Sequence, residues 1–337
     1  MTKAAIIGLG KMGLSHCSIL GAHPDVDLVA VCDSSSLIQD AFKKLTKTPV
    51  YSDYKKMIEE TKPECLFVVT PTKYHFEMVV YALERGIHVF CEKPFSLNVE
   101  EGQKMVNLVQ EKNLVNQVGY HNRFIGTFNE MKRLLEHKIL GDCYHFLGEA
   151  YGPVVLKEKG ETWRAERAQG GGCLFDYASH VLNLVYYIIG KPIEVKGTLL
   201  KHIYSKEVED AVYASIILEN GLTGQLSVNW SDDTYRKMST SIRVEGKNGK
   251  MIADATELKI YLKEENKKEG LPKGWSVKYI TDLTPQVNFN LRGEEYSSQV
   301  DYFIDCIKHH RPSDKSSFAT AFATDEIIDK LIINASN

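Results

Sequence analysis

The first 120 residues alternate short apolar runs with segments of helical spacing. Continuous apolar runs predict buried strands at Lys3–Leu9, Asp27–Cys32, Cys65–Val69, Ile87–Cys91 and Val115–Gly119. The segments between them predict helices, among them Lys11–Ala22, Tyr74–Arg85 and Val99–Lys112. Strands that are apolar at every position, rather than at every second one, are typical of a parallel sheet covered on both faces. The pattern therefore predicts a doubly wound, Rossmann-like α/β domain over residues 1–121.

The pattern changes after residue 121. A helix is predicted at Phe128–His137, a strand near Tyr144–Ala150, and a long apolar helix from about Cys173 to Ile189. Alternating segments with turn residues between them then predict strands at Val195–Ile203, Ala211–Leu218, Thr223–Val228, Ser239–Glu245 and Lys259–Leu262. The charged run Lys263–Glu269 is expected to be a solvated loop, and helices near Glu295–His309 and Phe318–Ile333 to end the chain. We expect residues 122–337 to form an α+β domain with a large, open, mainly antiparallel sheet.

Composition narrows the possible functions. A chain of 337 residues is long enough for two domains, and its net charge of −3 argues against a nucleic-acid partner. No run approaches the length of a membrane helix, and the first residues form a strand pattern instead of a signal peptide, so a cytoplasmic protein without a membrane partner is expected. The seven cysteines are scattered and form no Cys-x-x-Cys pair, which predicts neither a disulfide framework nor a metal site.

A glycine-rich turn follows the first predicted strand and begins the first helix. Gly8-Leu9-Gly10-Lys11-Met12-Gly13 has the spacing G-x-G-x-x-G, in which the glycines allow a tight turn, approach of a pyrophosphate and close helix–strand packing. Asp33 ends the second strand, where a carboxylate hydrogen-bonds the adenosine ribose. Because that carboxylate repels a 2′-phosphate and no Arg or Lys occurs in residues 34–37, NAD is predicted in preference to NADP.

Two further motifs carry groups suited to hydride-transfer chemistry. Lys93, in Cys91-Glu92-Lys93-Pro94, ends a predicted strand on the ligand side of the sheet, where its cation can stabilise alkoxide charge. After the glycines 170–172, Asp176 and His180 stand four residues apart, hence on one face of the predicted helix. Histidine titrates near neutrality and suits the proton transfer that accompanies oxidation of an alcohol. Each motif alone is also compatible with an ordinary surface lysine, a helix-start carboxylate or a core histidine.

Taken together and in this order, the three motifs resemble those of the glucose–fructose oxidoreductase / inositol dehydrogenase / rhizopine catabolism (Gfo/Idh/MocA) family. The segment 70–75 (Thr-Pro-Thr-Lys-Tyr-His) is similar to the family's Thr-Pro-Asn-x-x-His turn, and 119–123 (Gly-Tyr-His-Asn-Arg) to its Gly-Tyr-x-x-Arg segment. The resemblance covers essentially the whole chain. It implies an N-terminal Rossmann domain and a C-terminal α/β domain whose open sheet often mediates oligomer contacts, so a homodimer or homotetramer is expected.

The resemblance also implies roles for individual residues. Lys93 matches the family's catalytic lysine, His180 its acid/base histidine, and Asp176 the carboxylate that contacts substrate or relays protons. Cofactor contacts are implied for Gly8, Gly10, Lys11, Met12, Gly13, Asp33, Thr70, Pro71, His75, Glu92 and Lys93. Substrate contacts are implied for Lys93, Tyr120, Asn122, Arg123, Trp163, Arg164, Asp176 and His180. The chain departs from the family pattern at Thr72, Ala178 and Asn183, and the last of these removes a frequent second carboxylate from the helix.

The activity expected from these residues is reversible oxidation of a secondary alcohol of an inositol, sugar, sugar phosphate or nucleotide sugar. Aromatic and basic residues available for the pocket also include Tyr151, Arg167, Tyr235 and Arg236, and the arginines slightly favour a phosphorylated or nucleotide-linked sugar. Two alternatives on the same fold stay open, namely an NAD-dependent glycosidase and a dinucleotide sensor without catalysis. Retention of Lys93, Asp176 and His180 favours a dehydrogenase over the sensor.

Overall fold

The computed structural model describes residues 1–158 and 163–336, which divide into two compact units. The first contains Met1–His121 together with Gln286–Phe322, and the second contains Asn122–Pro285 together with Ala323–Asn337. The division after residue 121 coincides with the predicted boundary, but Gln286–Phe322 lies in the first unit and not in the second domain where the sequence analysis placed it. Among the described residues, no helix is both long and apolar enough to cross a membrane.

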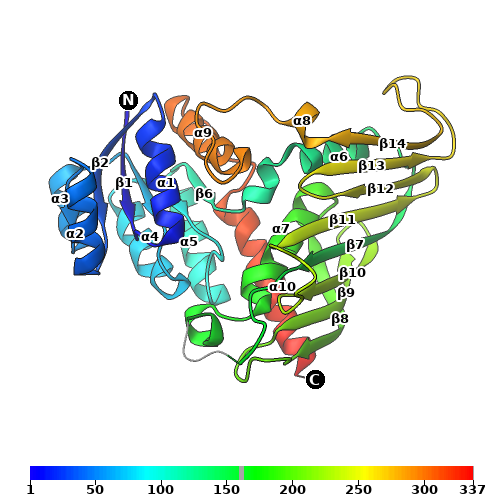
Figure 1. Cartoon of the computed structure of the whole chain (residues 1–337), viewed down its shortest axis with the longest axis horizontal. Coiled ribbons are helices and arrows are strands. Elements are labelled where there is room, and N and C mark those ends of the chain that lie inside the picture. The colour runs from blue at the N-terminus through cyan, green and yellow to red at the C-terminus, as the bar shows by residue number, and fades with distance from the viewer. Residues whose placement is uncertain (159–162, 337) are drawn as a thin grey trace. The chain divides into compact units, whose positions relative to one another are not determined.

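The first unit is a doubly wound Rossmann fold, as predicted (Figure 1). Its six strands are all parallel, in the order β3-β2-β1-β4-β5-β6. The strands are β1 Thr2–Ile7, β2 Val26–Cys32, β3 Val50–Tyr51, β4 Cys65–Val68, β5 His88–Cys91 and β6 Asn116–Val118. The helices are α1 Lys11–Ala22, α2 Ser36–Leu45, α3 Tyr54–Thr61, α4 His75–Glu84, α5 Val99–Glu111 and α9 Glu294–Lys308. Of these, β3, α2 and α3 were not predicted.

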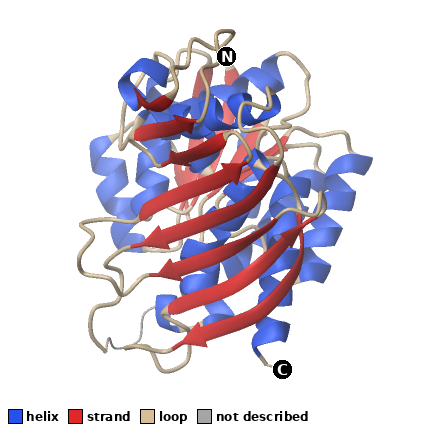
Figure 2. Cartoon of the chain, turned by 90° about the vertical axis from the view of Figure 1, so that its right-hand side faces the viewer, coloured by secondary structure: helices blue, strands red, loops and turns tan. Residues whose placement is uncertain are grey.

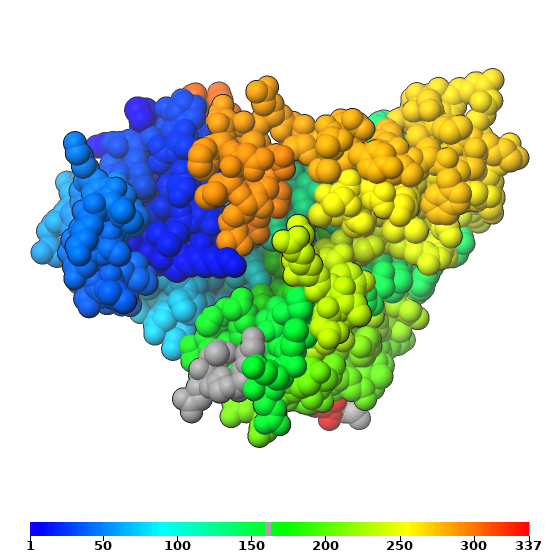
Figure 3. Space-filling view, viewed as in Figure 1, coloured from blue at the N-terminus to red at the C-terminus, as the bar shows by residue number. Residues whose placement is uncertain are grey.

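Both faces of the six-stranded sheet are covered. Alternate residues of β1 belong to two separate apolar clusters, Ala5 and Ile7 to one and Ala4 and Ile6 to the other. The second cluster includes Phe303 of α9, whose ring contacts the stacked rings of Phe67 and Phe90 at centroid distances of 5.5 and 5.9 Å. This burial explains why residues 286–322 pack with the first unit, and Figure 3 shows α9 (orange) directly against α1 (blue).

The second unit contains an eight-stranded sheet in the order β14-β13-β12-β11-β7-β10-β9-β8. Neighbouring strands are antiparallel except β7 and β10, which are parallel, so the mainly antiparallel sheet is confirmed. The strands are β7 Cys143–Tyr151, β8 Pro192–Lys201, β9 Ala211–Leu218, β10 Thr223–Asn229, β11 Ser239–Gly246, β12 Gly249–Ala253, β13 Glu257–Leu262 and β14 Gly274–Tyr279. Strands β12 and β14 were not predicted.

Helices α6 (Gly126–Glu136) and α7 (Ser179–Ile188) pack on one face of this sheet, and the opposite face, seen in Figure 2, is open. Burial alternates along the strands accordingly, as in β11, where every second residue is buried. A short helix α8 (Ile280–Leu283) follows β14, and α10 (Phe318–Ala335) ends the described chain. The single helix predicted from Cys173 to Ile189 is wrong in its first turn, because Leu174–Ala178 is a π-helical segment and only then does α7 begin.

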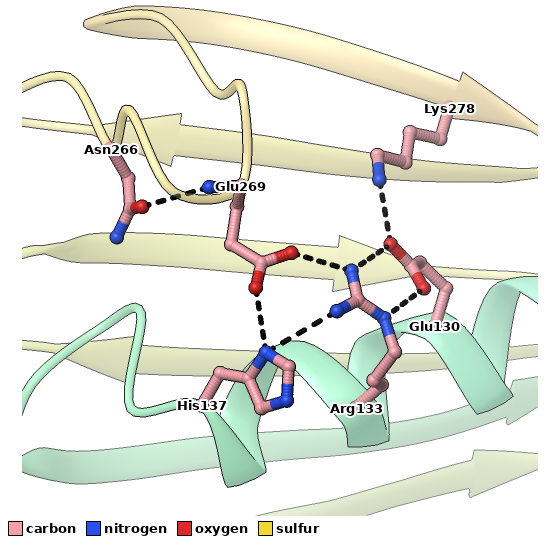
Figure 4. Close-up of polar contacts among 6 residues, drawn as sticks. All are labelled: Glu130, Arg133, His137, Asn266, Glu269 and Lys278. Atoms are coloured by element: carbon pink, nitrogen blue, oxygen red, sulfur yellow. Dashed lines mark hydrogen bonds and ion pairs between the residues drawn. The ribbon is translucent and has the colours of Figure 1, made fainter.

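The charged run at 263–269 is largely exposed, as predicted, but the side chain of its last residue, Glu269, is largely buried. The Glu269 carboxylate accepts hydrogen bonds from Arg133 at 2.7 Å and from His137 at 2.6 Å, both contributed by the α6 region (Figure 4). The bonds from Arg133 and His137 lower the pKa of Glu269 to about 2. Glu130 of α6 likewise accepts from Arg133 and from Lys278 of β14. This network joins α6 to the hairpin β13–β14.

Candidate active site

The glycine turn lies between β1 and α1. Gly8 has a φ of +92°, and its N–H donates to the carbonyl of Cys32 at 2.8 Å. A side chain at Gly8 would collide with the Val69 carbonyl, and one at Gly13 with the carbonyl of Gly8 itself. At Gly10, by contrast, a Cβ would meet nothing within 4 Å, and this residue precedes α1 as its N-cap without a side-chain hydrogen bond to the helix. The turn thus leaves an open approach to uncapped helix N–H groups, which suits a pyrophosphate.

Asp33 is fixed at the end of β2 by the same turn. Its Oδ2 accepts from the N–H of Leu9 at 2.7 Å and its Oδ1 from the N–H of Ser35 at 2.8 Å. The carboxylate therefore lies beside the glycine turn, as the dinucleotide motif requires. Lys11 and Met12 form the first turn of α1. The uncapped helix, the open side at Gly10 and the placed carboxylate together fit NAD.

His75 joins the turns that follow β4 and β5. Its Nε2 lies 2.9 Å from the Thr70 carbonyl and its Nδ1 lies 3.1 Å from the Pro94 carbonyl. Burial lowers the pKa of this imidazole below its ordinary value, so it is neutral near pH 7. Thr70 and Pro71 are thereby held next to the cis Lys93–Pro94 peptide. The structure gives His75 a role in holding these turns, and its cofactor contact stays a prediction.

Glu92, which precedes Lys93, has a buried partner that the sequence analysis missed. His16 Nε2 on α1 lies 2.7 Å from Glu92 Oε1, and the N–H of Lys93 donates to Oε2 at 3.1 Å. Burial acts to raise the pKa of Glu92, but the bond from His16 and the charges of His16 and Lys93 outweigh it, so the pKa is lowered. Glu92 is therefore an anion at neutral pH, covered by Gly119, where a Cβ would lie 2.8 Å from the carboxylate.

A second missed histidine lies near the same carboxylate. The ring of His121 stacks on that of Tyr296 at 4.6 Å, and burial lowers the pKa of His121 to about 4. The positive charges of Lys93 and Arg292 lower it too, while Glu92 acts in the opposite direction. Of the two missed histidines, His16 alone could have been found from the sequence, because it follows Gly13 by three residues and lies on the buried side of α1. The sequence carries no comparable signal for His121.

The second unit holds Asp176 and His180 at the start of its central helix. Asp176 lies in the π-helical segment and His180 in the first turn of α7, and both are buried. The Nε of Arg164 contacts Asp176 Oδ2 at 3.3 Å, and its guanidinium lies 4.4 Å from the ring of Trp163. The structure thus brings Trp163, Arg164 and Asp176 together. π-Helical turns occur often at functional sites.

Arg123 is engaged inside the second unit. Its Nε donates to Asn183 Oδ1 at 2.5 Å and its Nη2 to the Asn183 carbonyl at 3.0 Å. Asn183 in turn donates to Thr324 Oγ1 at 2.9 Å. The amide that replaces the family's frequent carboxylate is therefore a buried structural group. Substrate contacts of Arg123 and its neighbour Asn122 stay predictions, as does that of Tyr120, which belongs to the first unit.

Comparison with known proteins identifies the family. Residues 2–120 match the model described as an oxidoreductase family with an NAD-binding Rossmann fold, and residues 128–252 match the GFO/IDH/MocA C-terminal domain. The chain belongs to the Gfo/Idh/MocA family. The resemblance stated from the motifs is confirmed, and with it an NAD-binding domain in an oxidoreductase. The first matched segment contains the whole six-stranded sheet, and the second contains the eight-stranded sheet up to β12, with β13 and β14 beyond it.

Relatives in this family include characterised dehydrogenases. The D-glucoside 3-dehydrogenase of Escherichia coli is 29% identical over 239 residues, which are 65% of this chain and 67% of that protein. The myo-inositol 2-dehydrogenase of Thermotoga maritima is 25% identical over 278 residues, 80% of each chain. Among solved structures, a levoglucosan dehydrogenase in complex with NADH and L-sorbose matches with a TM-score of 0.89 at 20% identity, covering 99% of this chain and 96% of that one. The structural match supports the fold.

Proposed function

We propose that the protein is an NAD-dependent dehydrogenase that oxidises a secondary hydroxyl of a sugar, sugar phosphate, nucleotide sugar or cyclitol. The observation that carries the proposal is that one chain of this family combines the uncapped glycine turn with the Asp176–His180 helix start. A dinucleotide site supplies the oxidant, and a carboxylate with an imidazole supplies the acid–base groups. The named relatives act on a D-glucoside and on myo-inositol, which favours this substrate class.

Each catalytic group has a distinct part in the proposed reaction. NAD supplies the hydride acceptor when bound. His180 takes the proton of the hydroxyl, and Lys93 stabilises negative charge on the oxygen. Asp176 holds a neighbouring substrate hydroxyl or orients His180, with Arg164 beside it. The anionic Glu92 next to Lys93 balances the charge of the ammonium group.

Replacement of the two proton- and charge-handling residues tests this assignment. Lys93→Ala and His180→Ala are each expected to lower kcat by about 10²–10⁴-fold. NADH binding, followed by fluorescence, should stay largely unchanged because the glycine turn and Asp33 are intact. His202→Ala removes an exposed histidine of the second unit and serves as the control, with kcat unchanged. Near-full turnover by His180→Ala would show that another group is the acid/base.

We propose further that the open sheet mediates a homodimer or homotetramer. Trp275, Val277 and Tyr279 alternate along β14 and are 53%, 40% and 53% exposed. An open sheet face carrying such a row of apolar side chains is typical of an interface between copies. Light scattering during gel filtration should show a dimer or tetramer, and Trp275→Glu should lower the mass, whereas Leu45→Glu on α2 should not. A wild-type monomer at micromolar concentration contradicts the proposal.

A further inference from the structure

One buried carboxylate lies next to the Asp176 segment without belonging to the predicted site. Glu209 immediately precedes Asp210 and β9, and none of its surface is exposed. Its Oε1 accepts the N–H of Leu174 at 2.8 Å, and its backbone carbonyl accepts the N–H of Cys173 at 2.9 Å. Glu209 therefore holds Cys173 and Leu174, the residue before the π-helical segment and the first residue of it, which lie three and two positions before Asp176.

Gly172, which precedes this segment, leaves room for the Glu209 carboxylate because it has no side chain. Gly172 has a φ of +105°, and a Cβ there would lie 2.5 Å from Glu209 Oε1. The carbonyl of Gly172 accepts the N–H of Asp176 at 3.1 Å. A left-handed glycine is thus required at this position both by its backbone conformation and by the carboxylate packed against it. The contact links Glu209 directly to the turn that carries Asp176.

The other oxygen of Glu209 holds the loop that carries Arg164. Oε2 accepts from Arg167, which follows the turn Trp163–Ala165. That turn presents Arg164 to Asp176, and the carbonyl of Arg164 accepts the N–H of Gly172 at 3.2 Å. A buried carboxylate is strongly destabilising unless a cation and hydrogen bonds satisfy it, and Arg167 provides both. One side chain therefore ties the backbone of Leu174, two residues before Asp176, to the loop that carries Arg164.

We propose that Glu209 is a positioning residue for catalysis, which fixes Asp176 and Arg164 without touching the substrate. The proposal rests on the proposed function only in assigning Asp176 and Arg164 to substrate binding. In Glu209→Gln, an amide oxygen can still accept from Leu174, but the NH2 group then faces the donors of Arg167. The NH2 group of the glutamine and the guanidinium of Arg167 are both donors, so the ion pair between residues 209 and 167 is lost. We therefore expect the loop that carries Arg164 and the start of the π-helical segment to become more mobile.

The test compares Glu209→Gln with Glu130→Gln. Glu130 is a matched control because it is a largely buried carboxylate of the same unit that also accepts from an arginine, in the network of Figure 4. Hydrogen exchange of a peptide spanning 172–178 should be about tenfold faster in Glu209→Gln and unchanged in Glu130→Gln. For whichever of methyl α-D-glucoside, myo-inositol and D-glucose 6-phosphate the wild type oxidises, kcat/KM should fall about 10- to 100-fold in Glu209→Gln alone. NADH affinity should be unchanged in both.

Arg167→Lys is the second variant, for use if Glu209→Gln does not fold. It keeps a cation beside Glu209 but loses the forked donors, so exchange should rise in residues 164–170 and stay slow at 172–178. If hydrogen exchange at 172–178 is the same in Glu209→Gln as in wild type, the proposal is overturned. It is also overturned if exchange at 172–178 is faster in Glu209→Gln but kcat/KM stays within about twofold of the wild-type value. If the wild type oxidises neither a member of this panel nor any other polyol, glycoside, sugar phosphate or nucleotide sugar tested, the proposed function is wrong, and the exchange comparison alone decides whether Glu209 holds the turn.

Discussion

Asp210, next to Glu209, allows a sharp prediction about the stability of the second unit. Its carboxylate is fully buried and accepts five hydrogen bonds. Oδ2 accepts the N–H groups of Ile203, Tyr204 and Ser205 at 2.7, 2.7 and 2.8 Å. Oδ1 accepts the hydroxyl of Ser205 at 2.6 Å and the indole N–H of Trp230 at 2.7 Å. Asp210→Asn keeps the size of the side chain but turns one acceptor atom into a donor.

The loss of stability in Asp210→Asn depends on which carboxylate oxygen is replaced by the NH2 group. Placed at Oδ2, the amide NH2 would face three backbone donors, so the lower-energy orientation puts it at Oδ1. There the hydroxyl of Ser205 can rotate to accept, but the indole N–H of Trp230 cannot, and a buried donor left without an acceptor costs about 1–3 kcal/mol. Three bonds also lose their charged acceptor. We therefore expect Asp210→Asn to lower the free energy of unfolding by about 2–4 kcal/mol.

Urea unfolding followed by fluorescence measures this loss. Asp232→Asn is the control, because Asp232 is half-buried and accepts from the N–H and hydroxyl of the exposed Thr234, and it should cost less than about 1 kcal/mol. Burial acts to raise the pKa of Asp210, but its hydrogen bonds outweigh it and the pKa is lowered. The ionised carboxylate therefore stabilises the fold at neutral pH, and the gap between wild type and variant should narrow below about pH 4. A loss under about 1 kcal/mol at pH 7 would refute this account of Asp210.

Three other predictions concern the first unit. Gly13→Ala should weaken NADH binding, measured by isothermal calorimetry, about tenfold or more, because its Cβ has no room against Gly8. The control Gly21→Ala on the same helix meets open space, so it should leave stability, measured by thermal melts, unchanged or raised. Asp33→Asn should narrow the preference for NADH over NADPH in the same calorimetric assay, since it removes the charge that repels a 2′-phosphate. His121 has its pKa lowered to about 4 by burial, so the unfolded chain binds more protons between about pH 6.5 and pH 4. Wild type should therefore lose more stability than His121→Gln when urea unfolding is repeated at pH 5 instead of pH 7, and equal losses would contradict a neutral imidazole in the folded protein.

The strands and helices with long apolar patterns could be predicted from the sequence. Apart from Lys3 of β1 and His88 of β5, the residues of β1, β4 and β5 are buried, so a continuous apolar run marked each strand. β3 has only two residues, and β14 is an edge strand with half-exposed side chains, so neither carried a usable pattern. The π-helical segment covers only Leu174–Ala178, too few residues for its period to be distinguished from that of an α-helix.

The residues of the candidate active site likewise divide into those that could be predicted from the sequence and those that could not. The glycine turn and Asp33 were predictable because their geometry follows from local spacing, and the structure joins them through Leu9. The pairs His16–Glu92 and Arg167–Glu209 were not, because their members are 76 and 42 residues apart. Such pairs form only when the chain has folded, and a buried histidine or glutamate looks like any other in the sequence. Assignment of Gln286–Phe322 to the first unit likewise required the packing of α9 on the sheet.

The most direct test of the central claim is absorbance at 340 nm with NAD and a panel of polyols, glycosides, sugar phosphates and nucleotide sugars. A dehydrogenase of this kind produces NADH in step with oxidation of at least one carbohydrate, and Lys93→Ala and His180→Ala abolish most of that signal. A glycosidase that uses NAD transiently would release sugar from a glycoside without accumulating NADH. Silence across the whole panel while NAD is bound would contradict the dehydrogenase and favour a dinucleotide sensor.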